Sequence, residues 1–125
     1  MPVDLDDIRA RLTTIAEELA ALQPDDAATF EQNAEAFVAE IAGLEDSLAE
    51  IDAAHAGAQV FVTEPVPVYL VAAAGLENVT PDAFSEAVEE GQDVPPATLL
   101  ESLTLLQDGG VRVVVSGLDQ DFRRL

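Results

Sequence analysis

The fold is decided by one stretch of sequence, PDDAATFEQNAEAFVAEIAGLEDSLAEIDAAHAG at residues 24–57. Its apolar side chains recur at spacings of mostly four and three, which is the pattern of one helix face. They are Phe30, Ala34, Phe37, Ile41, Leu44, Leu48 and Ile51. Asp25 or Asp26 can cap the first free amides, and Gly57 suits the end of the helix. About 28 residues make a rod of roughly 40 Å, which is longer than a small domain is wide. Because the apolar seam is narrow, we expect this helix to pack along another helix or along a shared spine.

A second apolar stripe lies upstream of Pro24 and predicts a helix before the long one. Its members are Ile8, Leu12, Ile15, Leu19 and Leu22. Asp4, Asp6 and Asp7 lie near the positive end of its dipole. Pro24 ends this helix, because the residue before a proline is pushed out of helical backbone space. The two helices make up a predicted helical segment at residues 1–57.

After Gly57 the sequence changes to short β-branched runs, which are typical of buried strands. The two substantial runs are QVFVT at 59–63 and VRVVV at 111–115, and residues 78–79 make a very short third. Helical stretches separate these runs. We therefore expect parallel pairing with right-handed crossovers.

Three helices are expected between the strands. The first covers residues 68–74, and the second begins at Thr80-Pro81, where threonine can cap and proline suits the first helical position. The third follows Pro95-Pro96 and has a stripe of leucines expected to face the core: Leu99, Leu100, Leu103 and Leu106.

The predicted fold class is therefore α/β. It has two N-terminal helices, the second long and spine-like, followed by a small parallel-sheet α/β lobe. We place the lobe at residues 58–116. Residues 117–125 form a tail with no clear periodicity.

Composition excludes several classes of function. Twenty-five acidic residues against five arginines and no lysine give a net charge of −20, which repels nucleic acid and anionic membranes. The absence of cysteine excludes disulfides and thiolate metal sites. The longest uncharged apolar stretch, 65–76, is too short for membrane insertion. Neither a signal peptide nor a lipidation cysteine is visible, so the sequence as written predicts a cytoplasmic location.

Candidate functional residues are mostly acidic. Glu64 follows the strand that ends at Thr63, and ligands of open parallel sheets bind beyond the carboxyl ends of strands. A carboxylate there suits a divalent cation, or it caps the amides of the next helix. A second acidic group, which either surrounds a cation or is a solvated helix face, consists of Glu86, Glu89, Glu90 and Asp93. His55 is the only histidine, and no serine has a neighbouring base. The sequence therefore predicts a protein that is not an enzyme.

Three segments of the lobe carry a family resemblance: VTEPVPVYL at 62–70, GL at 75–76 and EEGQDVPP at 89–96. In this order they resemble the C-terminal lobe of metal-binding solute-binding proteins of zinc and manganese ABC importers. The segment LAALQPDDAATF at 19–30 is similar to the entry of that family's long interdomain helix. The resemblance covers roughly residues 3 to 115.

The resemblance implies two α/β lobes joined by a rigid helix, with a zinc or manganese ion held between them. Glu64 matches the ligand position of the C-terminal lobe. Glu90 matches a loop bordering the site, beside the ligands rather than on the metal, and His55 matches no ligand. The resemblance also implies an ABC permease as the partner. It further implies that the protein is a lipoprotein located outside the cytoplasm.

The sequence also departs from this family. The lobe that supplies two histidine ligands has no counterpart here, nor has a later acidic ligand. The sequence therefore resembles a truncated, internal piece in which metal binding is weak or absent. With one lobe missing, apolar surface on the spine would be uncovered, and we expect self-association through the long helix. The alternative hypothesis is an acidic helical interaction or structural protein without a metal function.

Overall fold

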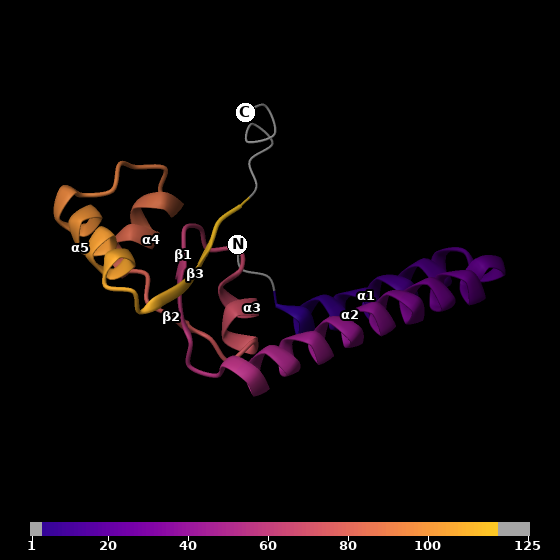
Figure 1. Ribbon diagram of the computed structural model, residues 1–125. Coiled ribbons are helices and arrows are strands. Elements are labelled where there is room, and N and C mark those ends of the chain that lie inside the picture. The colour runs from indigo at the N-terminus through magenta and orange to yellow at the C-terminus, as the bar shows by residue number, and fades with distance from the viewer. Residues whose placement is uncertain (1–3, 118–125) are drawn as a thin grey trace, which may run out of the picture.

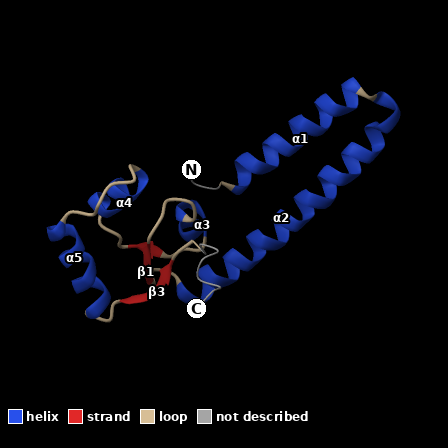
Figure 2. Cartoon of the chain, turned by 90° about the horizontal axis from the view of Figure 1, so that it is seen from above, coloured by secondary structure: helices blue, strands red, loops and turns tan. Residues whose placement is uncertain are grey.

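The computed structural model describes residues 4–117 and has the expected α/β architecture. The hairpin comprises α1 (Leu5–Leu22), a short 3-10 helix η1 (Pro24–Asp26) and α2 (Ala27–His55). The lobe contains β1 (Gln59–Val62), α3 (Val68–Ala73), β2 (Glu77–Asn78), α4 (Asp82–Glu89), α5 (Pro96–Gln107) and β3 (Val111–Val115). Figures 1 and 2 show the α1–α2 hairpin projecting from the lobe as a long arm. Of the predicted tail, only Gly117 lies within the described residues.

The hairpin forms largely as its sequence predicts. Asp4 caps α1, and its carboxylate accepts hydrogen bonds from the amides of Asp6 and Asp7 at 2.9 and 3.2 Å. The guanidinium of Arg9 joins α1 to Glu45 on α2. The prediction that Asp25 or Asp26 caps α2 was wrong: no side chain caps this helix. A 3-10 turn leads into α2 instead, and the Asp26 carboxylate accepts a hydrogen bond from the Gln23 side chain.

The sheet has three parallel strands in the order β2-β1-β3, which confirms the predicted parallel pairing. β1 lies in the centre, and Val60, Phe61 and Val62 are its buried residues. Because successive strand side chains alternate between faces, Val60 and Val62 share one face and Phe61 takes the other. Val60 and Val62 pack with Val71 of α3.

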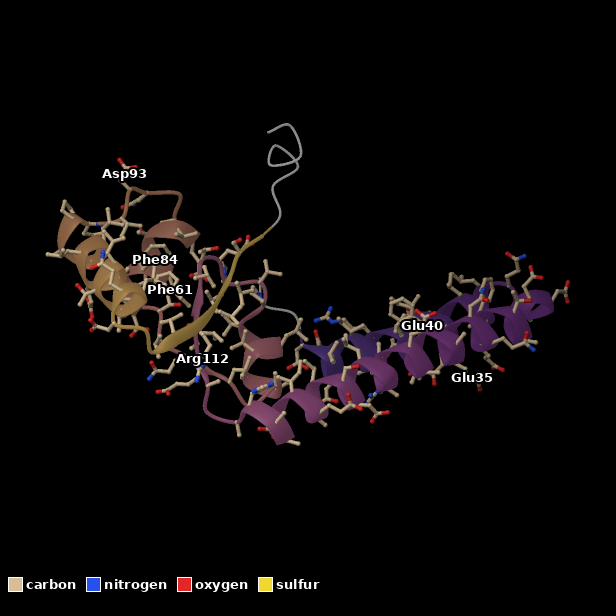
Figure 3. The ribbon with its side chains drawn as sticks, in the orientation of Figure 1. Glu35, Glu40, Phe61, Phe84, Asp93 and Arg112 are labelled. Carbon is tan, nitrogen blue, oxygen red and sulfur yellow. The ribbon has the colours of Figure 1, made fainter. Side chains whose placement is uncertain are left out.

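The opposite face of the sheet is covered by α4 and α5. Figure 1 shows α3 on one side of the strands and these two helices on the other. The rings of Phe61 and Phe84 meet edge to face with their centroids 5.0 Å apart (Figure 3). Phe84 belongs to α4, so this aromatic contact packs α4 against the central strand.

The leucine stripe of α5 does not form the core that the sequence predicts. Thr98 and Ser102 are the buried residues of this helix, and the Ser102 hydroxyl donates to the Thr98 carbonyl. The leucines are exposed, with Leu100 at 67%. In the described part of the chain, no element covers the leucine face, because the small side chains of α5 turn inward instead.

Thr80 does not cap α4, contrary to the sequence-based prediction. The N-cap position of α4 is Pro81, and no side chain caps the helix. The Thr80 hydroxyl accepts a hydrogen bond from the Val62 amide at 2.7 Å. β2 ends at Asn78, so Thr80 satisfies an amide of β1 that has lost its neighbouring strand.

Within residues 4–117, no helix is both long and apolar enough to cross a membrane.

Candidate metal site

Glu64 lies at the carboxyl edge of the sheet. β1 and β3 are parallel, so their carboxyl ends meet at this edge. The Thr63 amide and hydroxyl both donate to the Val115 carbonyl, at 3.0 and 3.3 Å, and so hold the two strand ends together. Glu64 follows directly and is half-buried. Its placement agrees with the rule that ligands of parallel sheets bind beyond the strands' carboxyl ends.

The carboxylate of Glu64 leans over the backbone that leaves β3. A β-carbon added to Gly117 would overlap one carboxylate oxygen of Glu64 and lie 2.9 Å from the other. Gly117 was missed by sequence reasoning, because it appeared only as the first residue of an unmatched tail. A glycine two residues after a strand gives no signal of its contact with a distant side chain.

The capping role considered for Glu64 is not what the structure shows. The N-cap position of α3 is Pro67, and no side chain makes a capping hydrogen bond there. The Glu64 carboxylate is therefore not used by the next helix. It is left as an oxygen donor of the kind that divalent cations bind.

The second acidic group lies at the end of α4 and in the loop that follows. Glu86, Glu89, Glu90 and Asp93 are all exposed. Figure 3 shows Asp93 at the outer end of the lobe. Among residues 4–117, no three histidine or carboxylate side chains gather closely enough to hold a metal ion. Glu64 and Glu90 therefore do not belong to a preformed cluster.

His55 lies at the other end of the lobe from Glu64. It lines a groove of about 640 Å³ together with Arg112 and apolar side chains. The groove includes Ala58 and Leu76, which precede β1 and β2, so it lies at the amino edge of the sheet. His55 cannot join Glu64 across the length of β1.

A further acidic groove of about 430 Å³ lies where the hairpin meets α3, and sequence reasoning missed it. Four acidic residues and Tyr69 are among the residues that line it: Asp4, Asp6, Glu45 and Asp52 are the acidic ones. Arg9 makes ion pairs with Asp6 and Glu45. Part of the negative charge of this groove is thus neutralised within the chain.

Comparison with solved structures finds similar folds. A crystal structure of ZnuA has 23% identity and a TM-score of 0.68, covering 90% of this chain and 42% of that one. The zinc-bound form of a mutant variant of AdcAII from Streptococcus pneumoniae has 15% identity and a TM-score of 0.65, covering 97% and 43%. The laminin-binding protein Lbp of Streptococcus pyogenes has 19% identity and a TM-score of 0.56, covering 82% and 37%. The chain thus spans about two-fifths of the length of these proteins.

Sequence comparison gives the family. No curated protein matches the chain. A family model described as zinc-uptake complex component A, periplasmic, matches residues 3–121. Because this match covers nearly the whole sequence, the chain belongs to the zinc-uptake complex component A family.

Proposed function

We propose that this chain acts in metal-ion uptake, as a metal-binding component that serves an ABC-type permease outside the cytoplasm. The cargo is zinc or manganese. The observation that carries the proposal is the position of Glu64 at the sheet's carboxyl edge, in a chain whose family is one of zinc uptake. The role is one of binding, not of catalysis.

Within this proposal the two parts of the chain have different tasks. The helical segment at 1–57 is the spine, and the lobe at 58–116 presents the metal-binding residues. Glu64 is the direct ligand, and Glu90 borders the site. Glu64 offers one or two oxygens, and the described residues hold no cluster of three ligands. Such an open site binds weakly, because affinity rises with the number and rigidity of the ligands.

Titration calorimetry with zinc tests this role of Glu64. We expect a dissociation constant of about 10⁻⁴–10⁻³ M, in the range of open carboxylate sites. Glu64→Gln removes the charge and keeps the shape, so it should abolish the measurable binding. Glu101→Gln on exposed α5 is the matched control and should leave binding unchanged. Submicromolar binding, or binding that survives Glu64→Gln, would contradict the assignment of this ligand.

A second candidate function is that of an acidic helical interaction protein, and the exposed seam of the hairpin favours it. Phe37, Leu44 and Ile51 of α2 are substantially exposed, although the α1–α2 packing buries Ile41. A second copy of the chain is the occupant we propose for this seam. Full burial of an exposed side chain of this size is worth about 1.5–3 kcal/mol, and these half-exposed side chains forgo part of that amount.

Sedimentation at low and high salt tests the self-association. Each chain carries a net charge of −20, so salt that screens the repulsion should tighten the association. Leu44→Glu should weaken it, because a charge would then enter the seam. Leu103→Glu on α5 is the matched control, since Leu44 and Leu103 are 44% and 46% exposed. A stable monomer at both salt concentrations would be evidence against this role of the hairpin.

A further inference from the structure

Two of the described glycines, Gly75 and Gly117, have a carboxylate in the space where a β-carbon would lie, and at Gly117 that carboxylate belongs to Glu64. A β-carbon at 117 would overlap the Glu64 side chain. Glycines 43, 57, 91 and 109 have nothing within 4 Å of the same position. The space beside Gly117 is therefore filled by one specific side chain, and that side chain is the proposed metal ligand.

The backbone itself does not require a glycine at this position. The described glycines with positive φ are Gly57, Gly75, Gly91 and Gly109. Gly117 is not among them, so its φ does not disfavour an alanine there. The atoms that a side chain at 117 would meet belong to the carboxylate of Glu64, which would have to move to make room.

The strand ends define where the carboxylate can go. Thr63 is tied to Val115 by two hydrogen bonds, which leaves Glu64 opposite the segment that follows β3. With glycine at 117, the Glu64 side chain can lie across the end of β3. With a β-carbon there, it would have to swing away from this edge.

We infer that Gly117 is a positioning residue for Glu64: its lack of a side chain lets the carboxylate lie over the end of β3, at the sheet edge where the metal would bind. The functional half of this inference rests on the proposed role of Glu64 in metal binding. The geometric half stands independently, because it concerns only where the side chain lies in the metal-free protein.

The chain offers a matched control at the other end of the same strand. A β-carbon at Gly110 would lie 2.8 Å from the side-chain oxygen of Gln59. Gly110 immediately precedes β3 and also lacks a positive φ. Gly110→Ala therefore crowds a flexible side chain at the amino edge and leaves Glu64 untouched.

The geometric half is tested by NMR on the metal-free full chain. We expect nuclear Overhauser contacts between the Glu64 side-chain methylenes and the Gly117 α-protons. Gly117→Ala should shift the Glu64 side-chain resonances, whereas Gly110→Ala should leave them in place. The absence of the contacts in the unmodified protein, or unchanged Glu64 resonances in Gly117→Ala, would overturn the inference.

The functional half is tested by zinc titration of the same variants, with thermal unfolding measured alongside. Gly117→Ala should weaken zinc binding about tenfold, as expected when the support of a metal ligand is lost. Gly110→Ala should bind zinc as the unmodified protein does. Equal zinc affinity in Gly117→Ala and the unmodified protein would overturn the positioning role. If the unmodified chain binds no zinc, the proposed function fails, and the NMR contacts alone decide the geometric inference.

Discussion

Replacing Phe61 with alanine is expected to lower the free energy of unfolding by about 3–5 kcal/mol, the usual cost of truncating a fully buried aromatic ring. Phe61 is 2% exposed and lies in the central strand. Its ring packs against Phe84, so the substitution leaves a cavity and also loosens α4 from the sheet. The free energy of unfolding of a native protein is only about 5–15 kcal/mol, so this single substitution removes a large part of it.

Urea denaturation followed by circular dichroism measures this loss. Phe37→Ala is the control, because Phe37 is 49% exposed on α2 and its ring is already half in water. We expect that change to cost about 1 kcal/mol or less. Equal losses for the two variants would show that the Phe61–Phe84 contact is not the centre of the lobe's core.

Replacing Gly75 with alanine is expected to cost about 2–3 kcal/mol, for two separate reasons. Gly75 has a φ of 68°, a backbone conformation that side chains disfavour. An added β-carbon would also overlap the carboxyl group of Asp52 on α2. The Gly57 amide donates to the Gly75 carbonyl at 2.8 Å, so this turn attaches the end of the spine helix to the lobe. The substitution should therefore weaken that attachment.

Two further variants separate these causes. Gly109 has a φ of 75° and nothing within 4 Å of its added β-carbon, so Gly109→Ala isolates the backbone strain at about 1–2 kcal/mol. The double variant Asp52→Ala/Gly75→Ala should recover the part of the stability loss that comes from the overlap, because the Asp52 carboxylate is then absent. Chemical denaturation of all these variants gives the comparison. If Gly75→Ala costs no more than Gly109→Ala, the Asp52 side chain simply rotates away.

The helical hairpin was predictable from sequence because its signals are local. The four-three spacing of apolar residues, the acidic start of α1 and the stop at Pro24 each act within a turn or two of the chain. The structure accordingly has α1 at Leu5–Leu22 and α2 at Ala27–His55, as the sequence indicates. The parallel sheet was also predictable, because strands separated by helices pair in parallel.

The candidate site was predictable only in part. The order of a buried strand followed by Glu64 was enough to place a carboxylate at the carboxyl edge of the sheet. The direction of that side chain was not predictable, because Gly117 lies far from Glu64 in sequence and meets it only when β1 and β3 pair. On spacing alone, the sequence favoured the alternative that Glu64 caps the next helix, and the structure shows no side-chain cap on α3.

The wrong predictions share a physical cause. The leucines of α5 have the spacing of a buried stripe, but whether a face is buried depends on the elements around it. Thr80 has the position of a helix cap, but the unpaired amide of Val62 competes for its hydroxyl and binds it. Local periodicity, prolines and glycines thus determined where the helices and strands lie along this chain. Only the tertiary structure decided which faces are covered and which polar groups meet, because both depend on segments that are distant in sequence.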